Sequence, residues 1–258
     1  MPTAVISDIH GNAEALKQVL ADIDARGIDR IISLGDIIGY GPDPLECVDI
    51  VRRRCAWSLM GNHDFGVLYE PTNFNPSAES AAFWTRDQFD AETDEKLRAE
   101  RYEFLGHLRV RVVESAPDGD TPILAVHGSP RRPINEYIFE EDARNAPDKM
   151  ESLFERVDRI ALVGHTHVPG VFTDEPDFYP PSELGDSTYK FLEDEKAIIN
   201  VGSVGQPRDM DARASYAILH ADRLEFVRVE YDIAKTAERI KAIPQLTDWL
   251  GERLYEGR

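Results

Sequence analysis

Cysteine is scarce in this sequence, and long apolar runs are missing altogether. Only Cys47 and Cys55 occur, without a C-x-x-C motif, which excludes a disulfide framework. No stretch approaches the roughly 20 apolar residues that a membrane helix needs. The chain runs at once into an expected strand at residues 3–7, without the basic and apolar regions of a secretion signal. We therefore expect a reduced, cytoplasmic protein with no membrane partner.

Basic residues are also few relative to acidic ones. The 258 residues include 29 Lys and Arg against 48 Asp and Glu, which gives a net charge of −19. Such a surface repels the phosphates of DNA, RNA and anionic lipids, so long nucleic acid is a poor candidate substrate. The plainest effect of the acidity is solubility. A local basic pocket remains compatible with a small phosphorylated substrate, and the composition leaves a homo-oligomer open.

The first part of the chain alternates strands with helices. Short apolar runs stand at residues 4–7, 31–34 and 56–60, and helical patterns at 12–25 and 44–54 lie between them. Strand–helix–strand alternation predicts parallel strands joined by right-handed crossovers. This half of the chain therefore predicts one sheet covered by helices.

The rest of the chain differs in pattern. Polar, helix-favouring segments at 77–89 and 93–105 predict a helical insertion around 77–106, and residues 233–254 predict a helix broken near Pro244. Closely spaced strand patterns predict hairpins and a second sheet packed face to face on the first. The segment 174–186, rich in Pro, Glu and Asp, predicts an exposed loop. We expect one domain over 1–258, and the later strands are predicted at 110–114, 123–126, 160–163, 197–201, 215–221 and 224–230.

Five of the seven histidines share one setting. Each follows a short apolar strand, beside Gly, Asp or Asn, whereas His107 and His220 lie outside this pattern and read as surface or core side chains. Because the carboxyl ends of neighbouring parallel strands meet at one edge of a sheet, residues far apart in sequence converge there. The segments are Ser7-Asp8-Ile9-His10-Gly11, Gly35-Asp36, Gly61-Asn62-His63-Asp64, Val126-His127-Gly128 and Gly164-His165-Thr166-His167.

These segments hold the side chains that a metal centre needs. In an extended chain residues i and i+2 point the same way, so Asp8 and His10 are expected to reach one point together, as are His165 and His167. Seven nitrogen and oxygen donors are too many for one tetrahedral ion and suit two ions bridged by a carboxylate. Such a pair of ions clamps a phosphate and activates water. The predicted ligands are Asp8, His10, Asp36, Asn62, His127, His165 and His167.

The ordered set Asp-x-His, Gly-Asp, Gly-Asn-His-Asp, strand-end His and Gly-His-x-His resembles the calcineurin-like metallophosphoesterase superfamily over residues 8–167. The resemblance implies an α/β fold, a four-layer αββα sandwich of two mixed β-sheets flanked by helices. It implies that Asp8, His10 and His167 hold one ion, that Asn62, His127 and His165 hold the other, and that Asp36 bridges them. His63 would stabilise charge or protonate the leaving group, with Asp64 orienting its ring.

The sequence departs from the protein serine/threonine phosphatases of that superfamily. Tyr40 and Met60 stand where those enzymes carry phosphate-facing arginines. The chain is more similar to the small bacterial and archaeal phosphodiesterase branch, including its Gly39-Tyr40-Gly41-Pro42 and 200–208 segments. That resemblance implies a small phosphodiester or nucleotide substrate and two divalent ions, with Mn as first choice and Fe, Zn, Ni or Co as alternatives.

Substrate contacts and alternative functions stay open at this point. Arg131 and Arg132 follow His127, and Arg208 ends a Gly-rich segment, so each either grips a phosphate or pairs with a surface carboxylate. Tyr40 either contacts substrate or packs in a turn. Alternative functions are a broad phosphomonoesterase, a bis-nucleoside polyphosphate hydrolase, or a non-catalytic scaffold like the retromer subunit that shares this fold; the complete ligand set disfavours the scaffold.

Overall fold

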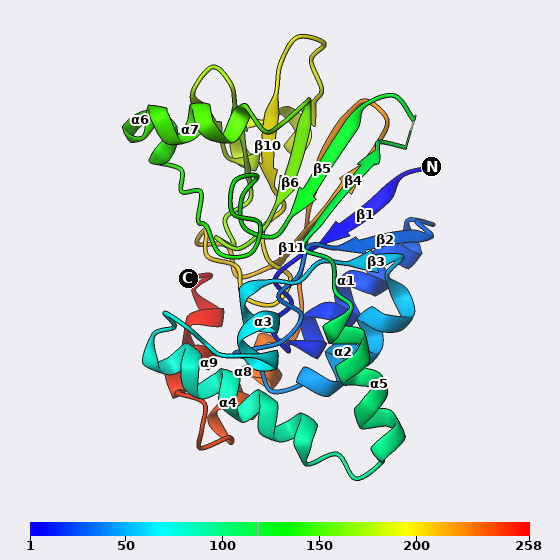
Figure 1. Ribbon diagram of the computed structural model, residues 1–258, viewed down its shortest axis with the longest axis vertical. Helices are drawn as coiled ribbons and strands as arrows, with labels where there is room; N and C mark the ends of the chain where they lie inside the picture. The colour runs from blue at the N-terminus through cyan, green and yellow to red at the C-terminus, as the bar shows by residue number, and fades with distance from the viewer. Residues whose placement is uncertain (118) are drawn as a thin grey trace.

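Two six-stranded mixed sheets form the centre of the molecule. The computed structural model describes residues 1–117 and 119–258. The sheets pack face to face, and helices cover their outer faces (Figure 1). This confirms the predicted four-layer α/β sandwich.

The first sheet has the strand order β3-β2-β1-β11-β12-β9. β1 pairs in parallel with β2, and β2 with β3, as the alternation of strand and helix predicts. The predicted β11–β12 hairpin is present, and it continues this first sheet antiparallel to β1 instead of joining the second. Its strands are β1 (Thr3–Ile6), β2 (Arg30–Ser33), β3 (Trp57–Ser58), β9 (Thr188–Lys190), β11 (Ala214–Leu219) and β12 (Arg223–Val229).

The second sheet has the order β4-β5-β6-β10-β7-β8, with β5, β6 and β10 parallel. The strand at the end of this order, β8, lies inside the segment 174–186, so the prediction of an exposed loop is wrong for Asp177–Tyr179. Phe178 of that strand is buried against Phe172, with ring centroids 4.7 Å apart. The strands are β4 (Arg111–Ser115), β5 (Pro122–Val126), β6 (Ile160–Val163), β7 (Gly170–Thr173), β8 (Asp177–Tyr179) and β10 (Ala197–Asn200).

Alternation along the strands divides the core into layers. In β1, Val5 faces the second sheet, whereas Ala4 and Ile6 pack against helices. In β5, Ile123 lies in the core between the sheets and Leu124 in the core under α7. Each sheet is therefore apolar on both faces, which is the pattern of sheets buried on both sides.

Most of the longer helices lie where the sequence predicts them. The predicted segments 77–89 and 93–105 correspond to α4 and α5, and the predicted break near Pro244 separates α8 from α9. Figure 1 shows α6 and α7 beside the second sheet and the other helices around the first. They are α1 (Ala13–Ala25), α2 (Pro44–Arg54), α3 (Asn62–Leu68), α4 (Pro76–Asp90), α5 (Glu95–Gly106), α6 (Asp142–Asn145), α7 (Pro147–Phe154), α8 (Ile233–Lys241) and α9 (Asp248–Glu252), with short 3₁₀ turns η1 (Pro181–Glu183), η2 (Gly185–Ser187) and η3 (Arg253–Tyr255).

A buried arginine fastens α5 to α2. Arg101 is 6% exposed and forms ion pairs with Asp49 of α2 and with Glu92, both at 2.7 Å. Within the described residues, no helix has the length and apolar character to cross a membrane.

Candidate metal centre

The candidate ligands follow the carboxyl ends of parallel strands from both sheets. Asp8 and His10 follow β1, Asp36 follows β2, and His127 and His165 follow β5 and β6. Asn62 is the first residue of α3, a helix that the sequence analysis missed because it has only seven residues and contains Gly66. The face-to-face packing of the two sheets thus brings the carboxyl ends of strands from both to one place.

The backbone at these positions is left-handed rather than extended. The φ angles are 52° at Asp8, 50° at His10, 51° at Asp36, 69° at His165 and 64° at His167. Non-glycine residues rarely adopt this region, and such strain collects at functional sites. The expectation that Asp8 and His10 meet is confirmed, although their backbone is not extended. The expectation for His165 and His167 is wrong, because they turn into different groups of ligands.

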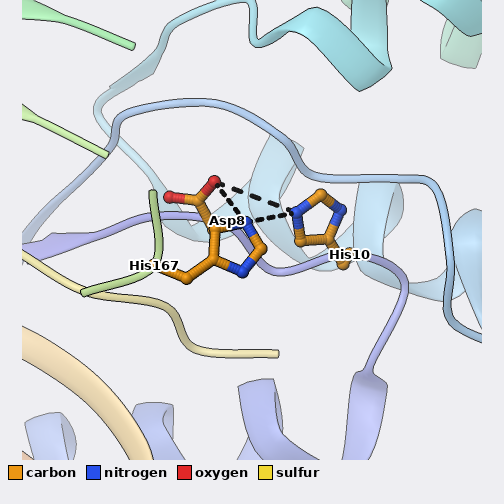
Figure 2. Close-up of side chains that lie close together, drawn as sticks. All are labelled: Asp8, His10 and His167. Carbon is orange, nitrogen blue, oxygen red and sulfur yellow. Dashed lines mark hydrogen bonds and ion pairs between the residues drawn. The ribbon is translucent and has the colours of Figure 1, made fainter. Parts of the chain in front are cut away.

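The first group consists of Asp8, His10 and His167, whose side chains point toward one another (Figure 2). Nε2 of His10 lies 3.0 Å from Nε2 of His167, and Oδ1 of Asp8 lies 3.2 Å from the latter and 3.8 Å from the former. The other oxygen of Asp8, Oδ2, accepts the Ser7 hydroxyl at 2.6 Å, and the His165 amide donates to both oxygens, at 3.1 Å to Oδ2 and 3.2 Å to Oδ1. These bonds leave Oδ1 directed at the two rings.

The second group consists of Asp36, His127 and His165, with Asn62 at its side. Nε2 of His127 lies 3.3 Å from Oδ2 of Asp36 and 3.3 Å from the amide oxygen of Asn62. The same Oδ2 lies 3.6 Å from Nε2 of His10, so Asp36 faces both groups. Gly61 permits this position, because a Cβ there would lie 2.0 Å from Oδ1 of Asp36.

Backbone carbonyls orient three of the imidazole rings. Nδ1 of His10 lies 3.2 Å from the Ile38 oxygen, that of His127 3.0 Å from the Leu34 oxygen, and that of His167 2.6 Å from the Gln206 oxygen. Since a carbonyl only accepts, each Nδ1 carries the proton and donates it. In the neutral rings Nε2 then has a lone pair directed at the centre, as in metal sites whose ligands are held from behind. The charge of Asp36 raises the pKa of His127 to about 9 despite burial, so a metal ion bound there would take the place of a proton on Nε2.

This donor set fits divalent metal ions. The Nε2 atoms of His10 and His167 face each other with lone pairs, and Nε2 of His165 is buried without a hydrogen-bond partner. Burial lowers the pKa of His165 to about 3, which keeps its ring neutral and able to bind a cation. Burial alone would raise the pKa of Asp8 and Asp36, but the neighbouring histidines lower both, so the carboxylates are charged.

His63 lies between Asp36 and Tyr40. Its backbone amide donates to Oδ1 of Asp36 at 2.8 Å, and its ring stands 4.3 Å from that of Tyr40 and 4.8 Å from that of His10. Nδ1 is buried without a partner against Gly39, where a Cβ would come within 2.5 Å. Burial lowers the pKa of His63 to about 4. A phosphate bound nearby would raise that pKa by adding negative charge.

Asp64 does not orient His63, so this part of the predicted site is wrong. Oδ1 of Asp64 accepts the amides of Ile37 and Ile38 at 3.0 and 3.3 Å, and Oδ2 accepts the amide of Gly61 at 3.0 Å. The carboxylate therefore fixes the loop that carries Asp36 and the start of α3. Burial and the charge of Asp36 raise the pKa of Asp64 to about 7, against the effect of these amides.

The predicted substrate contacts divide into two kinds. The guanidinium of Arg131 forms an ion pair with Glu136 at 2.5 Å, so of the two alternatives for Arg131 the structure has the pairing with a carboxylate. Arg132 is exposed. Arg208 instead lies beside the centre, with its guanidinium carbon 6.0 Å from the ring centroid of Tyr40. Tyr40 is buried next to His10, with ring centroids 4.8 Å apart.

Sequence reasoning missed an aromatic cavity beside the second group. The cavity has a volume of about 240 Å³, and its lining includes Asn62, His165, Phe65, Phe74 and Tyr137. The ring of Tyr137 stacks on that of His165 at 3.8 Å and an angle of 19°. The sequence signal for this cavity is the spacing of the aromatic residues Tyr137 and Phe139, two positions apart. Their ring centroids stack 5.3 Å from each other.

Comparison with known proteins agrees with this geometry. Residues 1–224 match the family model described as the calcineurin-like phosphoesterase superfamily domain. The chain belongs to this superfamily. This calcineurin-like phosphoesterase is similar to a metallophosphoesterase of Sphaerobacter thermophilus, at 38% identity and a TM-score of 0.81, with 100% and 99% of the two chains covered.

Two curated sequences are also similar to this calcineurin-like phosphoesterase. An uncharacterized protein of Methanocaldococcus jannaschii is 42% identical over 260 residues, which covers 99% of this chain and 98% of that protein. A symmetrical bis(5'-nucleosyl)-tetraphosphatase of Erwinia tasmaniensis is 35% identical over 71 residues, 26% of either chain. The first likeness spans the whole molecule, whereas the second covers a short part.

Proposed function

We propose that the protein hydrolyses small phosphodiester or nucleotide substrates with two divalent metal ions. The observation that carries this proposal is the pair of buried ligand groups that share the carboxylate of Asp36. When bound, two such ions hold a phosphate and supply an activated water. A cytoplasmic location belongs to the same proposal.

Each residue then has a stated task. Asp8, His10 and His167 hold one ion; Asn62, His127 and His165 hold the other; and Asp36 contacts both. Carboxylate, amide and imidazole donors suit Mn first and Fe, Zn, Ni or Co as alternatives. His63 stabilises charge on the phosphate or gives a proton to the leaving group.

The aromatic cavity supports a nucleoside as one substituent of the phosphate. Phe65, Phe74 and Tyr137 offer ring faces, and Asn73 and Asn135 offer amide groups that can pair with a base edge. A planar base therefore has both stacking partners and polar partners beside the second group.

A second candidate activity is hydrolysis of bis-nucleoside polyphosphates, favoured by the likeness over 71 residues to a bis(5'-nucleosyl)-tetraphosphatase. A broad phosphomonoesterase is a third, and the intact ligand set argues against a scaffold that has lost catalysis. Rates on model monoesters, diesters and dinucleotides, each with several metals, distinguish these activities.

Metal analysis tests the centre itself. Protein purified under mild conditions, or incubated with Mn and freed of excess metal, is expected to contain up to two transition-metal ions per chain by elemental analysis. The reason is that seven donors exceed the needs of one ion. A chain that retains no metal after incubation with Mn contradicts the assignment of these ligands.

Replacing Tyr137 by Ala tests the nucleoside cavity. We expect kcat/KM for a nucleoside p-nitrophenyl phosphodiester to fall by about tenfold, since stacking on one base contributes roughly 1–3 kcal/mol. The value for methyl p-nitrophenyl phosphate should change less than about twofold, because the same bond is cleaved without a base.

Two controls accompany this test. Tyr137→Phe keeps the ring and should keep the preference for the nucleoside ester. Metal content must also be measured, because Tyr137 stacks on the candidate ligand His165. An equal loss on both esters with full metal content would show that the cavity holds no base.

A further inference from the structure

Two arginines from distant parts of the chain share one neutral oxygen. Oε1 of Gln206 accepts hydrogen bonds from Arg208, at 2.6 Å to Nη2 and 3.2 Å to Nε, and from Nη1 of Arg253 at 3.1 Å. Arg208 stands in the loop after β10, and Arg253 begins η3 near the end of the chain. Two positive charges therefore meet at an amide that neutralises neither.

No carboxylate side chain forms an ion pair with either guanidinium among residues 1–117 and 119–258. The half-buried Arg228 and Arg52 do have such partners, Asp209 and Glu100. The half-buried Arg86 and Arg159 donate instead to backbone carbonyl oxygens. Nε of Arg253 donates to a main-chain oxygen of Arg258, the last residue of the chain, whose terminal carboxylate offsets part of the charge of Arg253. The guanidinium carbon of Arg253 lies 4.2 Å from the ring centroid of Trp249.

Positive charge is in excess where Arg208 and Arg253 meet, which agrees with the direction of the Arg253 pKa. Burial and the nearby charge of Arg208 lower the pKa of Arg253 to about 10. Two half-buried guanidinium groups that share one amide oxygen repel each other, and their Nη atoms meet no carboxylate side chain among the described residues. An anion between them would relieve that repulsion and use their remaining N–H donors.

The arginine pair adjoins the first group of metal ligands. The amide of Arg208 donates to the carbonyl oxygen of His167 at 3.2 Å, and the carbonyl oxygen of Gln206 accepts Nδ1 of His167 at 2.6 Å. Tyr40 stands between the guanidinium of Arg208, at 6.0 Å, and the ring of His10, at 4.8 Å. An anion held here therefore lies within the span of a substrate whose reacting phosphate sits at the metal centre.

We propose that Arg208 and Arg253 bind a second phosphate group of the substrate, so that the substrate carries two or more linked phosphates. This inference rests on the proposed function, because it takes the phosphate between the two ligand groups as the one that reacts. Guanidinium groups suit this task, since their planar N–H forks match phosphate oxygens.

Calorimetric titration of the metal-loaded protein with inorganic pyrophosphate tests the site. Arg253→Gln is expected to weaken pyrophosphate binding by roughly tenfold or more, the effect of losing a hydrogen bond between charged groups. Binding of inorganic phosphate should change less than about twofold, because one phosphate is held at the metal centre alone. Arg53→Gln, the same change at an exposed position on α2, should leave both affinities unaltered.

Two further variants keep the test decisive. Arg253→Lys retains the charge without the planar fork and should bind pyrophosphate more weakly than the wild type and more tightly than Arg253→Gln. Trp249 fluorescence should respond to pyrophosphate and not to phosphate, and Trp249→Phe should lose that response. If Arg253→Gln is unstable by its melting temperature, unchanged pyrophosphate binding in Arg253→Lys overturns the proposal.

The outcome is separable from that of the proposed function. Unaltered pyrophosphate affinity in Arg253→Gln, or equal weakening of phosphate and pyrophosphate, overturns the second-phosphate site even if the protein hydrolyses esters. Selective weakening of pyrophosphate supports the site, and it does so whether or not any ester is turned over.

Discussion

Asp36→Asn is expected to release both metal ions and to lower kcat/KM by more than about 10³-fold. Removing a single electrostatic contact to a transition state costs roughly 10²–10³-fold, and this carboxylate faces both ligand groups. Asparagine keeps the shape of the side chain, and its oxygen can still accept the amide of His63. The fold should therefore persist, with a melting temperature close to that of the wild type.

Asn62→Ala provides the matched comparison, because Asn62 contacts the second group only. We expect it to weaken one ion and to lower activity less than Asp36→Asn does. Elemental analysis and rates over a range of Mn concentrations measure both effects. Equal and mild losses in the two variants would show that Asp36 does not bridge.

Much of the centre could be predicted from the sequence because ligands at strand ends follow from topology. Asp8, Asp36, His127 and His165 each stand within three residues of the end of a parallel strand. Parallel strands bring their carboxyl ends together. The left-handed backbone at Asp8, His10 and Asp36 was not predictable, because only long-range packing compensates for such strain. The strand ends therefore located the candidate ligands. The i, i+2 spacing placed His165 and His167 together, whereas the family resemblance assigned them to different ions, in line with the two groups in which they lie.

The remaining errors arise from contacts between distant residues. The sequence pattern of the β11–β12 hairpin predicts two antiparallel strands but not the sheet that they join. The pairing of Thr3 with Leu219 places the hairpin in the first sheet. Arg131 looks like a phosphate ligand until Glu136 is seen to bind it. Arg253 carries no local signal at all, since its position beside Arg208 depends on where η3 packs.

Asp64 illustrates the same limit within a recognised motif. Its place next to His63 in sequence suggests an orienting carboxylate, but side chains one residue apart on a helix point in different directions. In the first turn of α3 its oxygens accept the amides of Gly61, Ile37 and Ile38 instead. Adjacency in sequence was therefore a poor guide to contact at the start of a helix.

His63→Ala is expected to keep both metal ions and to lower turnover by roughly 10²–10⁴-fold, the range for a lost general acid. The assignment gives His63 to neither ion, although His10, Asp36 and His63 also form a group whose ligand atoms lie within 4.8 Å of one another. Retention of both ions in this variant therefore also tests that assignment. The loss should be largest for alkyl esters, whose alkoxide leaving groups need a proton. It should shrink for nitrophenyl esters, because nitrophenolate leaves without one.

The pattern of losses separates three roles of His63. A group that stabilises charge without transferring a proton lowers the rates on both kinds of ester alike. A histidine that only packs against Gly39 and Phe74 would instead lower the melting temperature and leave specific activity near normal. Metal content, melting temperature and rates on both esters should therefore be measured on one preparation of the variant. Unchanged turnover of the alkyl ester, with both ions bound, would refute a catalytic role, because proton transfer and charge stabilisation by His63 would each lower that rate.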